Sequence, residues 1–114
     1  MSEVHDPGLM PTGSPTAPLL PGHPHVAYRD GHLCVESVRL DELAERHATP
    51  LFVYSRAAML DALAAYQRGF AGRDALICYA MKANSSLAVL RVFAQAGCGF
   101  DIVSGGELER VLAA

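Results

Sequence analysis

The feature that most constrains the fold of this chain is a regular alternation of strand-like and helix-like segments after residue 50. Apolar runs of strand length are predicted at 51–54, 75–82 and 99–103, and a segment with helical periodicity follows each of them. An order of this kind is typical of parallel strands joined by right-handed helical crossovers. The sequence therefore predicts an α/β fold.

Three such strand–helix units cannot close a barrel by themselves, because an eight-unit barrel takes about 250 residues. The chain has 114 residues, and its last predicted helix reaches Ala114 without a C-cap or a final polar turn. We therefore interpret residues 50–114 as the first three βα units of an incomplete barrel. We expect the chain to be the amino-terminal piece of a larger protein.

The first 49 residues divide into a tail and a small ordered unit. Residues 1–25 carry six prolines without periodic burial, so we predict a disordered tail there. In 26–49, Asp30-Gly31 between two short apolar pieces predicts a hairpin with a tight turn, and a helix follows until Thr49-Pro50. A lone hairpin is marginal in water, so it is expected to pair with strands outside this chain.

Composition excludes several classes of function. The formal charge is -3 and there is no basic run, so no nucleic-acid partner is predicted. No apolar segment is long enough for a membrane span, and no secretory signal is visible, so a cytoplasmic location is expected. The three cysteines form no CxxC pair, and Cys78 and Cys98 are interpreted as small core residues. A His-x-His pair at 23–25 lacks nearby acidic or cysteine partners, so no metal site is predicted.

Lys82 is the candidate catalytic residue. It is the only lysine, whereas eight arginines supply the other formal positive charges. Lysine differs from arginine because its amine can lose a proton when desolvated and act as a nucleophile that forms a Schiff base. Strand alternation places Cys78, Ala80 and Lys82 on one face, which leaves room for a planar group beside the amine. The alternative is a lysine that ends a buried strand and extends its charge into solvent.

A second candidate is Asp101, in the middle of the third predicted strand. A carboxylate in a buried strand is costly unless it is paired or hydrogen-bonded, and in a barrel it could face the same lumen as Lys82. The alternative is a purely structural, hydrogen-bonded acid. Ser104 and Glu107 have the spacing of a capping box, and Gly105-Gly106 permit a tight turn without any phosphate-loop pattern.

Two motifs make the resemblance specific. Residues 79–84 read Tyr-Ala-Met-Lys-Ala-Asn, and residues 99–108 read Gly-Phe-Asp-Ile-Val-Ser-Gly-Gly-Glu-Leu. Together with Pro-Leu-Phe-Val-Tyr at 50–54, they resemble the amino-terminal part of the diaminopimelate decarboxylases, in the fold type III pyridoxal-phosphate decarboxylase family. The resemblance covers about residues 28–114 and leaves the proline-rich tail unexplained.

This resemblance implies a partial (β/α)8 TIM barrel of the alanine racemase-like type. The preceding hairpin would join a carboxy-terminal β domain. Lys82 would carry pyridoxal 5'-phosphate covalently, Asp101 would line the cofactor pocket, and Ala80 would be the small residue beside the cofactor ring.

The implied activity is decarboxylation of meso-diaminopimelate to L-lysine, in a complete protein expected to be a homodimer. The resemblance places the phosphate loop, the acid that pairs the pyridine nitrogen, and the substrate-binding residues after residue 114. The 114 residues alone are therefore expected to be inactive. Two alternatives stay open: a related amino-acid decarboxylase of the same fold, and a non-catalytic decarboxylase-like protein that binds a partner protein.

Overall fold

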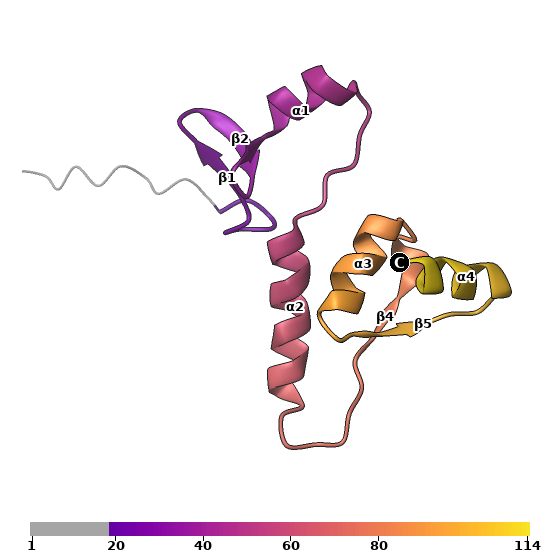
Figure 1. Cartoon of the computed structure of the whole chain (residues 1–114). Helices are drawn as coiled ribbons and strands as arrows, with labels where there is room; N and C mark the ends of the chain where they lie inside the picture. Colours follow the sequence, from indigo (N-terminus) through magenta and orange to yellow (C-terminus); the bar gives the residue numbers. More distant parts are fainter. Residues whose placement is uncertain (1–18) are drawn as a thin grey trace, which may run out of the picture.

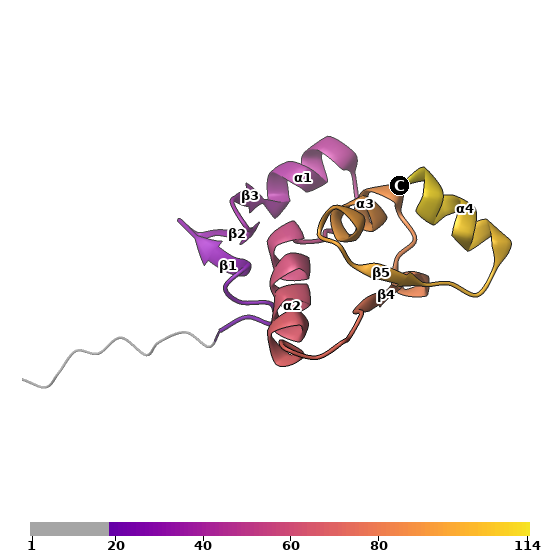
Figure 2. The same ribbon diagram turned by 60° about the horizontal axis from the view of Figure 1, so that its bottom comes forward.

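A computed structural model describes residues 19–114 of the chain. In chain order the elements are β1 Val26–Arg29, β2 His32–Val35, β3 Val38–Arg39, α1 Leu40–His47, α2 Arg56–Gly69, β4 Cys78–Ala80, the 3-10 turn η1 Met81–Ala83, α3 Leu87–Gln95, β5 Gly99–Asp101 and α4 Gly105–Ala113. The first three strands and α1 form one group, α2 lies next to it, and β4, β5, α3 and α4 form a second group (Figures 1 and 2). Within residues 19–114, no helix has the length and apolar character needed to span a bilayer.

The predicted hairpin forms, and a third strand extends it. β1 and β2 pair antiparallel, and the two residues of the connecting turn, Asp30 and Gly31, have φ angles of 50° and 79°. Positive φ at both positions is what a tight type I′ turn requires, so this prediction is confirmed. β3 then pairs with β2, which gives the sheet order β1-β2-β3. The sequence analysis did not predict β3, because a two-residue strand carries almost no periodic signal.

The tail prediction for 1–25 is wrong at its carboxy-terminal end. Residues 1–18 lie outside the described residues, but 21–25 form turns. The amide of His25 and that of Val26 both donate to the carbonyl of Gly22, at 2.9 and 3.0 Å. Gly22 adopts a φ of 87°, and this left-handed conformation lets the proline-rich segment turn back on itself.

The His25 side chain contacts an acidic residue of α2. Its Nε2 lies 2.8 Å from Oδ2 of Asp61 on α2. Residues 19–114 contain no group of three or more His, Cys, Asp or Glu side chains arranged to hold a metal ion.

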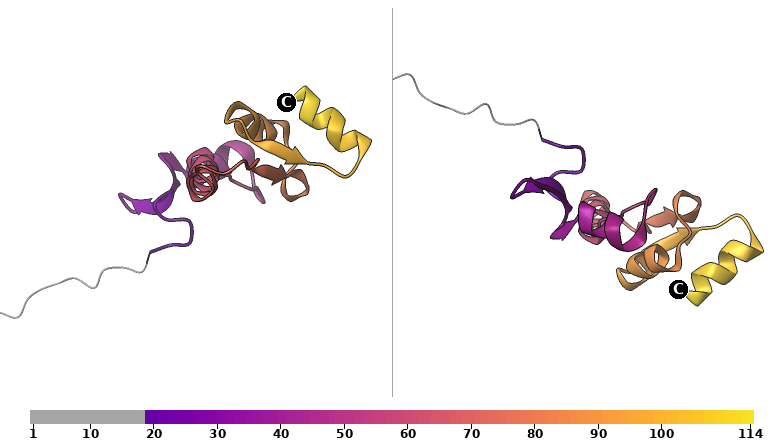
Figure 3. Two further views of the ribbon diagram at one scale, coloured as in Figure 1. Left: turned by 90° about the horizontal axis from the view of Figure 1, so that it is seen from below. Right: turned by 90° about the horizontal axis from the view of Figure 1, so that it is seen from above.

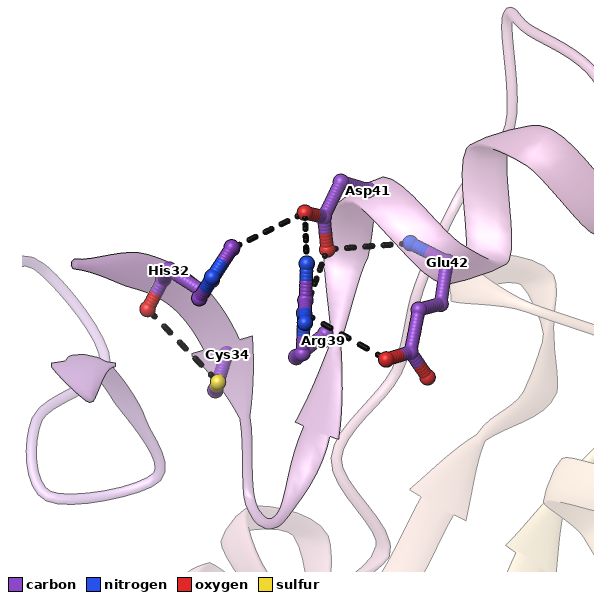
Figure 4. Close-up of polar contacts among 5 residues, drawn as sticks. All are labelled: His32, Cys34, Arg39, Asp41 and Glu42. Atoms are coloured by element: carbon purple, nitrogen blue, oxygen red, sulfur yellow. Dashed lines mark hydrogen bonds and ion pairs between the residues drawn. The ribbon is translucent and has the colours of Figure 1, made fainter. Parts of the chain in front are cut away.

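A small charged cluster fixes the start of α1 to the sheet (Figure 4). The Asp41 carboxylate accepts hydrogen bonds from Nε and Nη2 of Arg39, at 3.0 and 2.5 Å, and its Oδ2 lies 2.9 Å from Nδ1 of His32. The Arg39 guanidinium holds the pKa of the Asp41 carboxyl well below its usual range. These contacts join β2, β3 and the first turn of α1, which spans the residues where a helix was predicted.

Glu36, in the turn between β2 and β3, connects this sheet to α2. Its Oε1 accepts from Oγ of Ser55 at 2.7 Å and from the amide of Ala57 at 2.8 Å. Ser55 Oγ in turn accepts from the amide of Ala58 at 2.9 Å, as predicted for an N-cap. The amides of Ala57 and Ala58 have no hydrogen-bond partner inside α2. They donate instead to the side chain of Glu36, in the turn between β2 and β3, and to that of the N-cap residue Ser55.

The strand predicted at 51–54 does not form. These residues are extended but have no sheet partner, and Phe52 is 91% exposed. Within the described residues, the parallel sheet contains only β4 and β5. A strand needs a hydrogen-bonded neighbour to be stable, and at 51–54 the sequence specifies only the apolar pattern.

The core lies between α2, α3 and the two parallel strands. It contains the buried side chains of Leu63, Val89, Phe93 and Cys98, with Tyr79 and Phe100 packed against them. Tyr79 stacks on Phe93 with ring centroids 4.3 Å apart. Cys98 is buried as predicted, and burial raises the pKa of its thiol. The same prediction is wrong for Cys78, which is exposed.

Helix α3 spans Leu87–Gln95, as predicted, and ends in a Schellman motif. Gly97 has a φ of 74°, its amide donates to the carbonyl of Ala94, and the amide of Cys98 donates to the carbonyl of Phe93. This turn sends the chain directly into β5, and α4 then packs beside α3 (Figure 3).

The contact of Glu36 with α2 predicts a pH-dependent contribution to stability. Its hydrogen bonds to Ala57 and Ser55 lower the pKa of Glu36 from the usual 4.5. A carboxyl whose pKa is lower in the folded state stabilises the fold above its unfolded pKa, and this contribution is lost as the pH falls through the folded pKa. We expect Glu36→Gln to lower the melting temperature of the full-length protein at pH 7, with a smaller difference below pH 4.

The matched control is Glu45→Gln on α1, because the exposed Glu45 side chain forms no hydrogen bond within residues 19–114. Its melting temperature should follow that of the unsubstituted protein at every pH. A Glu36→Gln difference that stays constant from pH 3 to pH 7 would contradict the assignment of the contact to the ionised carboxylate.

Candidate functional site

The two faces of β4 have different environments. Tyr79 packs against the core, and Met81, directly after the strand, is fully buried. Cys78 points away from this core and is exposed, and Ala80 is half-buried. Within β4, the bulky Tyr79 thus packs on the core, and the small Cys78 is left exposed.

Lys82 does not continue the alternation of β4, which corrects the prediction that the strand reaches this residue. The strand ends at Ala80, and Met81–Ala83 form a 3-10 turn. The turn nevertheless leaves the lysine accessible, since the buried Met81 anchors it while the Lys82 side chain is exposed. Within residues 19–114, the Lys82 ammonium has no ion pair or hydrogen bond.

The segment after Lys82 is held by three polar contacts. The Tyr79 hydroxyl donates to the carbonyl of Asn84 at 3.1 Å, and burial raises the pKa of this phenol. The amide of Ser86 donates to Oδ1 of Asn84 at 2.9 Å. The N-cap of α3 is Ser86, whose side chain forms no capping hydrogen bond. Asn84 shapes the loop that leads into the helix.

The third contact comes from a residue that sequence reasoning missed. Nε and Nη2 of Arg110, on α4, donate to the carbonyl of Ser85 at 2.9 and 2.8 Å. Arg110 and Ser85 are 25 residues apart in the chain. No periodicity or motif could have indicated this pair, because a side-chain bond to a backbone carbonyl depends only on how α4 folds back.

Asp101 lies beside Ala80, because the parallel register pairs these two residues directly. The prediction that the acid is buried is wrong for the described residues, where Asp101 is exposed and its carboxylate accepts no hydrogen bond. In the same register Gly99 pairs with Cys78, and a Cβ at Gly99 would lie 2.7 Å from the cysteine sulfur. The Asp101 face of the two strands therefore carries the small residues Cys78, Ala80 and Gly99, and the Leu76 side chain also lies close to Gly99.

The start of α4 fixes the chain that follows Asp101. Ser104 Oγ accepts from the amide of Glu107 at 3.2 Å, as the capping box predicts. In a capping box the Glu107 side chain would accept from the amide of the cap residue, Ser104. Here Glu107 Oε2 accepts instead from the amide of Val103, at 2.6 Å, one residue before the cap. Glu107 thus has a local structural role.

An apolar groove of about 750 Å³ lies between α2 and β4, but it contains neither Lys82 nor Asp101. Its lining includes Met59, Leu63 and Tyr66 from the helix and Tyr79 and Ala80 from the strand. It offers no acidic or basic side chain. We therefore assign the candidate chemistry to the end of β4, where Ala80 pairs with Asp101 of β5 and Lys82 follows in the 3-10 turn.

These residues suit a covalently held aldehyde cofactor. The Lys82 amine is accessible and has no acidic partner within residues 19–114, and the neighbouring Ala80 carries only a methyl group. A lysine amine that is not held in an ion pair can form an imine with an aldehyde, and a neighbouring carboxylate can orient a cationic group.

Comparison with known families gives one match that covers this site. A family model described as "Pyridoxal-dependent decarboxylase, pyridoxal binding domain" matches residues 56–114, which include Ala80, Lys82 and Asp101.

Several curated relatives are named diaminopimelate decarboxylase. The chain is 56% identical over 88 residues to the diaminopimelate decarboxylase of Pseudomonas aeruginosa, which covers 77% of this chain and 21% of that protein. It is 54% identical over 85 residues to the diaminopimelate decarboxylase of Vibrio cholerae, which covers 75% of this chain and 20% of that protein. The chain thus spans about one fifth of the length of these relatives.

Solved structures show the same α/β fold. The crystal structure of AQ1208 from Aquifex aeolicus superposes with a TM-score of 0.73 at 46% identity, covering 79% of this chain and 22% of that one. A diaminopimelate decarboxylase from M. jannaschii, solved in complex with L-lysine, superposes with a TM-score of 0.66 at 34% identity, covering 81% of this chain and 23% of that one.

Proposed function

We propose a function from the premise that this chain belongs to the pyridoxal-dependent decarboxylases, whose pyridoxal binding domain it matches over residues 56–114. The proposed reaction of the complete protein is the decarboxylation of meso-diaminopimelate to L-lysine. The relatives at 54–56% identity carry the name of that enzyme, and one solved relative holds L-lysine, the product of this reaction. In this proposal the described strands and helices are the first part of a (β/α)8 barrel, and the complete protein is a homodimer.

The observation that carries the proposal is the environment of Lys82. It is the only lysine of the chain, it lies inside the matched domain, and it follows β4, which ends at the small residue Ala80. Its exposed amine is free of acidic partners within the described range. Lys82 is therefore the residue that would hold pyridoxal 5'-phosphate covalently.

Three side chains of this chain would take part in the reaction. Lys82, once its amine is free and protonated, would donate a proton to the α-carbon after carbon dioxide has left. The Ala80 methyl leaves space for a flat ring against β4, and Asp101, in register with it, would orient a cationic group by its negative charge. Bound pyridoxal phosphate supplies the electron sink for the carbanion that remains when carbon dioxide leaves.

A related amino-acid decarboxylase remains the second candidate, because Lys82 and Asp101 would serve any substrate that carries an α-amino acid group. A non-catalytic relative that binds a partner protein has less support. The chain carries a lysine with an exposed side chain, Lys82, inside the matched domain. The first relatives in the comparisons are named as decarboxylases of diaminopimelate, which favours that substrate.

The role of Lys82 predicts the outcome of a charge-preserving substitution. Lys82→Arg in the full-length protein should abolish the visible absorption that pyridoxal phosphate acquires on covalent attachment, because a guanidinium stays protonated and does not form an imine. Carbon dioxide release from meso-diaminopimelate should fall to background. Arg68→Lys, on the exposed surface of α2, is the control and should keep both signals. A Lys82→Arg protein that retains the band and turns over would refute the assignment.

The two explanations for Asp101 make different predictions. If Asp101 orients a bound cationic group, Asp101→Asn should lower kcat/KM by about tenfold or more, which is about 1.4 kcal/mol of transition-state stabilisation. The melting temperature should barely change, since the carboxylate accepts no hydrogen bond within residues 19–114.

Glu107→Gln is the matched control for the same carboxylate-to-amide change in the neighbouring turn. Its amide oxygen can still accept from the Val103 amide, so activity should stay near that of the unsubstituted protein. A large loss of thermal stability in Asp101→Asn, with unchanged turnover per folded molecule, would support a purely structural acid.

A further inference from the structure

The contact between Arg110 and Ser85 joins two segments that are distant in the chain and close to the candidate site. Two nitrogens of one guanidinium, Nε and Nη2, donate to a single backbone carbonyl at 2.9 and 2.8 Å. Ser85 is three residues after Lys82, and Arg110 lies in the last turn of α4.

The other polar contacts of this segment are local. The Tyr79 hydroxyl reaches the carbonyl of Asn84 five residues away, and the Asn84 side chain reaches the amide of Ser86 two residues away. These bonds shape the segment but do not place it relative to the rest of the molecule. Within residues 19–114, two side chains from outside residues 83–86 bond to the backbone of this segment: Tyr79, five residues from its partner, and Arg110, 25 residues from its partner.

Helix α4 is itself tied to the strand that carries Asp101. Ser104 and Glu107 bond to backbone amides on either side of the turn that leads from β5 into α4. A path of bonded groups thus runs from β5 through the capped start of α4 to Arg110, and from there to the segment that follows Lys82. The strand register places Asp101 beside Ala80. The contact of Arg110 with Ser85 then joins the segment after Lys82 to helix α4.

We propose that Arg110 is a positioning residue that holds the turn bearing Lys82 through the carbonyl of Ser85. This inference rests on the proposed function, since it concerns the orientation of the lysine amine toward a bound cofactor and substrate. In this proposal Arg110 acts through the carbonyl of Ser85 and not by binding the cofactor or the substrate. It acts by restricting the backbone three residues away, and small displacements of a reacting group are costly to rate.

The chemistry of the contact requires arginine. A planar guanidinium presents two parallel N–H donors in a rigid fork, whereas a lysine ammonium presents a compact charge on a flexible stem. Arg110→Lys can restore one bond to the carbonyl but not the paired arrangement. Its effect should therefore be smaller than that of Arg110→Met, which keeps much of the aliphatic stem and removes every donor.

The experiment uses the full-length protein with Arg110→Met, Arg110→Lys and the control Arg68→Met. Arg68 is also exposed on a helix, and its side chain forms no hydrogen bond within residues 19–114. The measurements are kcat and KM, the dissociation constant of pyridoxal phosphate, the pH at which the visible band changes, and amide hydrogen exchange of residues 83–86 in the cofactor-free protein.

Arg110→Met should lower kcat by about tenfold, with KM changed by less than about threefold, because the contact orients a reacting group rather than binding substrate. It should also shift the pH at which the visible band changes, weaken cofactor binding, and speed amide exchange at residues 83–86. Arg110→Lys should recover part of each effect. Arg68→Met should match the unsubstituted protein in all of them.

The proposal is overturned if Arg110→Met lowers only the melting temperature and leaves kcat per folded molecule, the pH response and the exchange unchanged. If Arg110→Met does not fold, Arg110→Lys decides in the same way, and unchanged values again overturn the proposal. An unsubstituted protein that takes up no pyridoxal phosphate would instead overturn the proposed function.

Discussion

The packing of one face of β4 against α3 is the constraint on which the rest of this arrangement depends. Met81 is fully buried, and Tyr79 stacks on Phe93 with centroids 4.3 Å apart. Burying apolar side chains of this size stabilises a fold by about 1.5–3 kcal/mol each, so the direction of the strand and of the turn after it is well determined. Once Met81 is buried, its neighbour Lys82 is left outside the core.

The second parallel strand, β5, packs on the same core and lies beside β4 at the candidate site. The Schellman motif at Gly97 turns the chain from α3 straight into β5, where Phe100 packs against the core and Asp101 falls in register with Ala80. The capped start of α4 and the reach of Arg110 to Ser85 then connect the end of β5 to the segment after Lys82. Residues that are distant in the chain thus come to one end of a two-stranded parallel sheet, where the family's pyridoxal chemistry is proposed.

The sequence predicted those parts of the fold that are determined locally. The Asp30-Gly31 turn, the cap at Ser55, the span of α3 and the capping box at Ser104 follow from backbone conformation and nearby hydrogen bonds. The parts that depend on distant partners were not predictable. The strand expected at 51–54 has no neighbour to pair with among the described residues, β3 exists only because β2 is beside it, and Arg110 reaches Ser85 across 25 residues. For the candidate site, the identity of Lys82 was visible in the sequence, but its place in a 3-10 turn and the exposure of Asp101 were not.

The central claim is that Lys82 is the residue that binds the cofactor covalently, and reductive trapping tests it directly. The full-length protein is incubated with pyridoxal phosphate, reduced with borohydride, digested, and mapped by mass spectrometry. The account predicts a phosphopyridoxyl group on the peptide that contains Lys82 and none on that peptide when the reductant is omitted. Stoichiometric labelling of a different lysine, with Lys82 unmodified, would contradict it.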